Sequence, residues 1–84
     1  MKCEKRKIIM KSMEDLKEKR RKTEANISLL KSDAELTYDE AERTGQITLV
    51  TKASALRRRS TELQGEMRKM TADLEEKEKL LKNT

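Results

Sequence analysis

Two clusters of basic side chains are the residues of this chain whose type and spacing best fit a chemical task, the binding of phosphate groups. They are Lys17, Lys19, Arg20, Arg21 and Lys22 in the run KEKRRK, and Arg57, Arg58 and Arg59 in the run RRRS. Lysine and arginine neutralise phosphates, and the formal net charge of +5 favours acidic partners. A basic helical module that binds nucleic acid or an acidic protein is therefore one function that the sequence predicts.

Other features make phosphate binding the second choice. Glu14, Asp15 and Glu18 interrupt the first basic region. Tyr38 is the only aromatic residue, so stacking on single-stranded bases has almost no support. Lysine and arginine also cover the solvated faces of ordinary coiled coils. We therefore rank a solvated helical surface above a nucleic-acid site.

Residues for catalysis or metal binding are scarce. The chain has no histidine and a single cysteine, Cys3. A zinc site within one chain, and catalysis of the Cys–His or Ser–His–Asp kind, need residues that this chain lacks. We expect no enzyme activity, no metal, no cofactor and no small-molecule substrate. No apolar run approaches the roughly 18 residues of a membrane-spanning helix. We expect no membrane partner and an intracellular location, in the cytoplasm or nucleus.

The composition predicts the elements that carry these side chains. With 84 residues, of which 44% are charged, 33% are apolar and none is proline, the chain has little material for a globular core. Abundant Ala, Glu, Lys, Leu and Arg with helical periodicity are typical of a coiled coil. We predict one all-α folding unit over residues 1–84.

Apolar side chains recur at alternating steps of three and four residues, which is the spacing of a heptad repeat. They mark one line along each half of the chain, with Arg20, Ser60 and Lys77 as polar interruptions. The predicted self-association seam consists of Ile9, Met13, Leu16, Ile27, Leu30, Ala34, Leu49, Leu56, Leu63, Met67, Met70, Leu74 and Leu81.

The two heptad series do not join, because the step from Thr44 to Leu49 is five residues. Gly45 can adopt the left-handed conformation that ends a helix, and the β-branched residues that follow lower helix propensity. Thr48 is the candidate N-cap of the next helix. We predict helices over about 7–44 and 49–82, with a turn over about 45–48. A stutter within one continuous rod is the alternative.

Charge favours the reversal. Residues 1–22 carry ten basic and four acidic side chains, residues 23–44 two and six, residues 45–61 four and none, and residues 62–84 five and six. Folding back at Gly45 sets the acidic block beside the basic block that follows it. A parallel pair of rods instead sets each block against its own copy, which opposes that pairing. We therefore predict an antiparallel helical hairpin.

The seam predicts a register for the hairpin. Pairing residues whose numbers total 90 sets Ala34 beside Leu56 and Ile27 beside Leu63, centred on Gly45. A register shifted by one heptad, with totals of 97, stays open. Each arm would be about 55–60 Å long at 1.5 Å per residue.

Two helices on a narrow seam are marginally stable alone. A second set of apolar residues lies off the seam and gives a possible second interface, formed by Leu29, Leu36, Tyr38, Ile47 and Val50. A stripe wider than one seam is typical of bundle helices, so we predict a dimeric four-helix bundle. A domain-swapped pair of antiparallel rods satisfies the same charge pairing.

The first choice of function is thus a self-association and scaffolding module, as a piece of or an accessory to a larger protein. A homodimer is the favoured assembly, and another helical protein is a possible partner. Nucleic acid or an acidic protein is the second choice.

Overall fold

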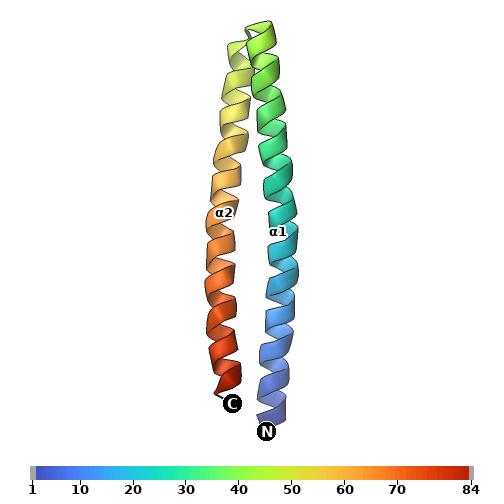
Figure 1. Ribbon diagram of the computed structural model, residues 1–84, viewed down its shortest axis with the longest axis vertical. Coiled ribbons are helices and arrows are strands. Elements are labelled where there is room, and N and C mark those ends of the chain that lie inside the picture. Colours follow the sequence, from blue (N-terminus) through green and yellow to red (C-terminus); the bar gives the residue numbers. More distant parts are fainter. Residues whose placement is uncertain (1, 84) are drawn as a thin grey trace.

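The chain forms a hairpin of two long helices in the computed structural model, which describes residues 2–83, with side chains from Glu4 onward. Helix α1 spans Lys2–Thr44 and helix α2 spans Ile47–Lys82. The helices run antiparallel and both chain ends lie at the same end of the rod (Figure 1). The rod measures 64 × 14 × 13 Å. The side chain of Cys3 lies outside the described part.

The reversal of the chain takes two residues. Gly45 has a φ of 72°, and its amide donates a hydrogen bond of 2.7 Å to the carbonyl oxygen of Ala41. This is the glycine-ended helix terminus in which a left-handed residue caps an otherwise unpaired carbonyl. Gln46 is extended, with φ −84° and ψ 115°, and α2 begins at the next residue. The described chain is therefore a hairpin rather than a continuous rod.

Thr48 does not cap α2, contrary to the prediction from its side chain. Gln46 holds the N-cap position without a side-chain hydrogen bond, and Thr48 lies exposed in the first turn of α2. Gly45 already reverses the chain, so only one extended residue is needed before the helix starts. The β-branched residues Ile47 and Thr48 do not delay the start, because their helix propensity is only slightly lower than that of other residues.

Helix α1 begins earlier than the predicted residue 7. Residues 2–7 are mostly lysine, arginine and glutamate, which favour helix, and Glu4 lies in the first turn, where a negative charge complements the helix dipole. At the other end, Lys79 and Lys82 lie in the last turn of α2, where positive charge is favourable. Local charge thus lengthens α1 beyond its heptad seam.

The two helices pair in the predicted register, in which the numbers of facing residues total about 90. Tyr38 and Ser54 share a hydrogen bond, and Arg20 donates one to Thr71, so the numbers of these pairs total 92 and 91. Near the chain ends, Arg6 donates to the carbonyl oxygen of Leu81 at 3.4 Å, a total of 87. The alternative register with totals of 97 is not adopted, because a turn of two residues leaves no slack for a one-heptad shift.

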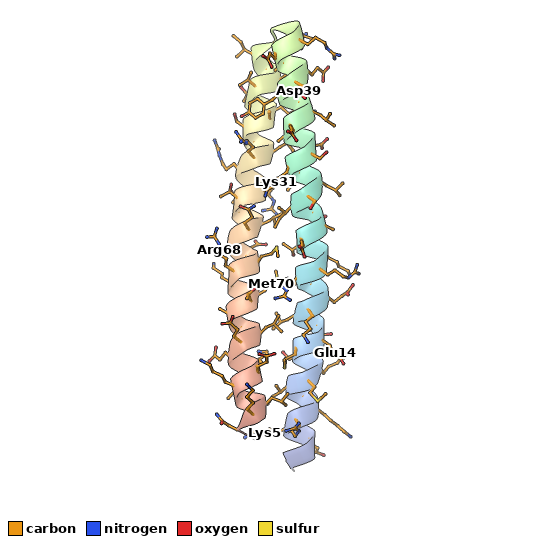
Figure 2. All side chains as sticks on the ribbon, viewed as in Figure 1. Lys5, Glu14, Lys31, Asp39, Arg68 and Met70 are labelled. Atoms are coloured by element: carbon orange, nitrogen blue, oxygen red, sulfur yellow. The ribbon has the colours of Figure 1, made fainter. Side chains whose placement is uncertain are left out.

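The core is a single line of side chains between the helices. Its buried apolar members are Met13, Ile27, Ala34, Ala41, Ala53, Leu63, Met70 and Leu74. In Figure 2, Met70 points toward α1, whereas Glu14 and Arg68 point away from the facing helix. Among the described residues, no large side chain is less than 2% exposed. A core of this kind positions two helices but encloses no interior.

Candidate interaction surfaces

The predicted seam residues meet one another across the hairpin. Each of the thirteen is buried or half-buried, and the two lines of side chains face each other within one chain. Threonine joins the seam by turning its hydroxyl to its own helix, as Thr23 does by donating to the carbonyl oxygen of Lys19 at 2.9 Å. The seam is therefore occupied by intramolecular packing, and contact with a second molecule needs other surfaces.

The polar interruptions of the seam are handled in different ways. Arg20 donates a hydrogen bond of 3.4 Å to Thr71 across the hairpin, and Lys77 lies 3.3 Å from Asp73 on its own helix. The Oγ of Ser60 is buried, and the structure gives it no hydrogen-bond partner. An unpaired buried hydroxyl costs stability, so Ser60 is a weak point in the seam.

Tyr38 is the centre of a polar cluster beside the seam. Its hydroxyl shares a hydrogen bond of 3.1 Å with Ser54, and the guanidinium carbon of Arg57 lies 5.5 Å from the ring centroid. The hydrogen bond to Ser54, with a smaller contribution from Arg57, lowers the pKa of the Tyr38 hydroxyl below its ordinary value near 10. These contacts tie α1 to α2 next to the turn.

A half-open groove of about 500 Å³ lies on the Tyr38 side of the hairpin. Lys31 and Arg57 line it together with Glu35 and Asp39, so its formal charges cancel. The groove therefore prefers neither an anion nor a cation. The hydrogen bond between Tyr38 and Ser54 across the two helices was not predicted from the sequence. It could have been, because the predicted register, with residue numbers that total about 90, also brings these two residues beside the seam close together.

The five residues of the possible second interface lie on two faces rather than one. Leu29 and Leu36 are seven residues apart, so they share one face of α1. Tyr38 is two residues beyond Leu36, about 200° further around the helix, where it contacts Ser54 and Arg57. Val50 is seven residues before Arg57 and Ile47 is seven before Ser54, so both belong to the Tyr38 side. A second molecule cannot cover all five through one flat contact.

The two basic clusters are also separate. Arg58 is level with residue 32 of α1, so the second cluster lies roughly 15 Å along the rod from Lys22. Several members already have partners within the chain. Arg57 lies over Tyr38, Arg59 pairs with Glu62 at 3.2 Å, and Arg21 pairs with Glu18 at 2.6 Å. The Arg21 hydrogen bond lowers the pKa of Glu18. The two clusters do not form one phosphate-binding surface.

Within the first cluster, Arg20 is half-buried, and Arg21, which pairs with Glu18, is exposed. The three lysines, Lys17, Lys19 and Lys22, are also exposed. None of the three takes part in an ion pair with a described residue. They lie in the half of the rod that contains the chain ends, which we call the terminal half and define as residues 1–22 and 68–84. It carries 15 basic and eight acidic side chains, a net charge of +7. The turn half, residues 23–67, carries six and eight, a net charge of −2.

Ion pairs within 4 Å form along single helices among the described residues. They join Lys11 to Asp15, Arg21 to Glu18, Arg59 to Glu62 and Lys77 to Asp73. The complementary blocks 23–44 and 45–61 therefore lie side by side without direct cross-helix ion pairs. Their attraction acts at longer range, where individual contributions are small and screened by salt.

Within residues 2–83, neither helix has a stretch of the length and apolarity needed to cross a membrane. The described side chains also include no cluster of three or more His, Cys, Asp or Glu residues placed to hold a metal ion. No protein-family model, curated protein or solved structure matches this chain.

Proposed function

We propose that the hairpin is a self-association module that forms a homodimeric four-helix bundle and serves as a scaffold, within or beside a larger protein. The observation that carries this proposal is the exposure of large apolar side chains after the seam has closed. Ile8 is 70% exposed, Leu29 68%, Leu36 64% and Ile47 80%. Leaving this apolar surface in water costs free energy that a partner would recover.

The total exposed area supports the same conclusion. The hairpin exposes 6834 Å². A compact monomer of its 9.8 kDa exposes about 5,200 Å², so the rod carries about 1,600 Å² more than a globular chain of equal mass. A standard interface takes roughly 800 Å² from each partner. The rod thus has ample surface for a second copy.

Stability favours a dimer for a further reason. The hairpin has one line of small and medium side chains as its core, and the hydroxyl of Ser60 is unpaired within it. Chains of this size with so thin a core gain from oligomerisation, because it buries apolar surface without adding chain to order. Dimerisation would supply that burial.

Sedimentation equilibrium from low micromolar to several hundred micromolar chain tests the proposal. We expect the mass to approach twice 9.8 kDa as the concentration rises. The paired change Leu29→Ser and Leu36→Ser should weaken association. The matched change Ala25→Ser and Ala72→Ser, at exposed positions that contribute little apolar area, should not. A mass of 9.8 kDa at every concentration would overturn the proposal.

A second candidate function is binding to nucleic acid or to an acidic protein. The observation that favours it is the net charge of +7 on the terminal half, with Lys17, Lys19 and Lys22 exposed. Fluorescence anisotropy with a labelled DNA duplex, repeated at rising salt, tests this function. Phosphate binding should weaken steeply with salt because bound counterions are released. Absence of any salt-sensitive binding would remove this candidate.

A further inference from the structure

One exposed stripe of α1 is complementary to its own reversed copy. Ile8, Asp15, Lys22 and Leu29 follow one another at seven-residue intervals, so they lie in line along the helix. Each precedes a residue of the seam by one position, which turns it about 100° away from α2. Ile8 and Leu29 are 70% and 68% exposed, and the Asp15 side chain is 69% exposed. We call these four residues the α1 stripe.

When two copies of the α1 stripe face each other in opposite directions, apolar residues meet apolar residues and each charge meets an opposite charge. Pairing residues whose numbers total 37 sets Ile8 against Leu29 of a second copy and Asp15 against Lys22 of that copy. The neighbouring heptad registers do not match. A total of 44 sets Ile8 against Leu36, but it also sets Asp15 against Leu29 and Lys22 against its own copy. A total of 30 sets Asp15 against its own copy. Opposed like charges are unfavourable, so the pattern selects one register.

We propose that two hairpins associate through the α1 stripe in an antiparallel sense, with a two-fold axis between Glu18 and Lys19. This inference rests on the proposed homodimer and names its contact face and orientation. By the two-fold symmetry, the apolar contact of Ile8 with Leu29 and the ion pair of Asp15 with Lys22 each form twice, as in any contact of a surface with its own copy.

The net charge of the facing segments supports the antiparallel sense. In this arrangement residues 23–36 of one copy, with a net charge of −2, lie beside residues 1–14 of the other, with +3, and only residues 15–22, with +3, face their own copy. A parallel arrangement sets all three segments against their own copies. Complementary charge selects orientation even where single exposed pairs contribute little.

Some residues that flank the α1 stripe favour the proposed dimer contact and others oppose it. Lys5 falls near Asp33 of the second copy, a favourable contact that occurs twice. Glu18 and Lys19 flank the two-fold axis, so each lies near its own copy, and each of these two unfavourable contacts occurs once. The balance of charge across the contact is favourable, and Lys19→Ala should tighten the dimer.

Charge reversal tests the register. Asp15→Lys alone and Lys22→Asp alone each replace two attractive contacts by repulsive ones, so each should raise the dimer dissociation constant about tenfold. The double variant Asp15→Lys with Lys22→Asp should restore association to near the starting value. Glu75→Lys, an exposed charge reversal on α2, is the matched control and should leave the constant unchanged. Helicity by circular dichroism verifies that each variant is folded.

Spin labelling tests the orientation. A single label at Ser32→Cys, in a Cys3→Ser background, reports only distances between copies. The antiparallel dimer predicts about 40 Å between labels, at 1.5 Å per residue from the two-fold axis. A parallel dimer predicts less than about 20 Å, because neighbouring helix axes lie 8–10 Å apart.

The outcomes separate this inference from the proposed function. A dimer whose labels lie close together, or whose double charge variant fails to recover, overturns the α1 stripe contact and leaves self-association intact. A chain that remains monomeric overturns both.

Discussion

The turn half and the terminal half of the rod pack in different ways. The buried apolar residues nearest the turn are alanines: Ala34 is 2% exposed, Ala41 5% and Ala53 0%, whereas the buried Ile27 and Leu63 of this half lie farther from the turn. In the terminal half, the buried residues are larger, including Met13, Met70 and Leu74. Because the distance between helix axes follows the side chains at the contact, alanines let the helices approach closely and larger residues hold them apart. The two ribbons accordingly come together at the turn in Figure 1.

Large apolar side chains are exposed on both halves of the rod, because they lie off the seam of their own helix. In the turn half, Leu36 and Ile47 are 64% and 80% exposed. The seam leucines near them, Leu49 and Leu56, are half-buried between the helices. In the terminal half, Ile8 is 70% exposed.

The largest expected effect comes from removing volume in the terminal half. Leu74→Ala leaves a cavity between the helices and should lower the free energy of unfolding by about 2 to 4 kcal/mol. Urea unfolding followed by circular dichroism, at one fixed chain concentration, measures it. Lys69→Ala, at an exposed position of the same helix, is the control and should change stability by less than about 0.5 kcal/mol. Equal losses at both positions would contradict the packing difference.

The second largest effect on stability should come from adding side-chain volume to the seam in the turn half. Ala53→Leu overfills a seam that has no free space at this position, and should cost about 1 to 3 kcal/mol. Ala55→Leu adds the same atoms two residues away on the exposed side, and should be close to neutral. The same urea unfolding measures both variants. A stabilising Ala53→Leu would show that the helices can separate beside the turn without cost.

Substitutions of glycine at the turn should change the stability by a smaller amount. Gly45 has a φ of 72°, which an L residue adopts at a cost, so Gly45→Ala should destabilise the hairpin by about 1 to 2 kcal/mol. Gly65 lies within α2 with open space around it, and Gly65→Ala should stabilise by up to about 1 kcal/mol. Thermal unfolding by circular dichroism measures both. If the two changes had the same sign, the left-handed turn would not be what reverses the chain.

The smallest expected effect is a shifted titration in the turn half. Tyr38 is the only tyrosine, and there is no tryptophan, so absorbance near 295 nm follows its ionisation alone. In the folded chain, its pKa should lie below 10. Ser54→Ala removes the main cause and should move the pKa back toward 10, whereas Ser32→Ala should not.

The sign of the coupled stability change follows from that shift. The pKa of Tyr38 is lower in the folded chain than in the unfolded chain, so loss of its proton favours folding. The contribution is present above pH 10 and disappears as pH falls through the folded pKa; it is absent at neutral pH. An unshifted pKa in the wild-type chain would mean that the Tyr38 and Ser54 hydroxyls do not meet in solution.

Much of the hairpin follows from the sequence alone. The heptad spacing identifies both helices and the residues between them, because a period near 3.5 marks one face of a helix whatever it packs against. The break between Thr44 and Leu49, together with a glycine, locates the reversal. The ends of the helices at Thr44 and Lys82 agree with the predicted residues 44 and 82. These features are local, so nearby residues suffice to determine them.

The tertiary structure decided what depends on two helices at once. The tight turn at Gly45 and Gln46 determines three features. The helices pair in the register in which residue numbers total about 90 rather than 97. Helix α2 begins at Ile47 rather than at residue 49, and Tyr38 forms a hydrogen bond with Ser54. The same geometry sets Ile47 and Val50 of α2 on the Tyr38 side of the hairpin, away from Leu29 and Leu36. Periodicity assigns a side chain to a face of its own helix, but only the pairing of the helices determines which faces remain exposed.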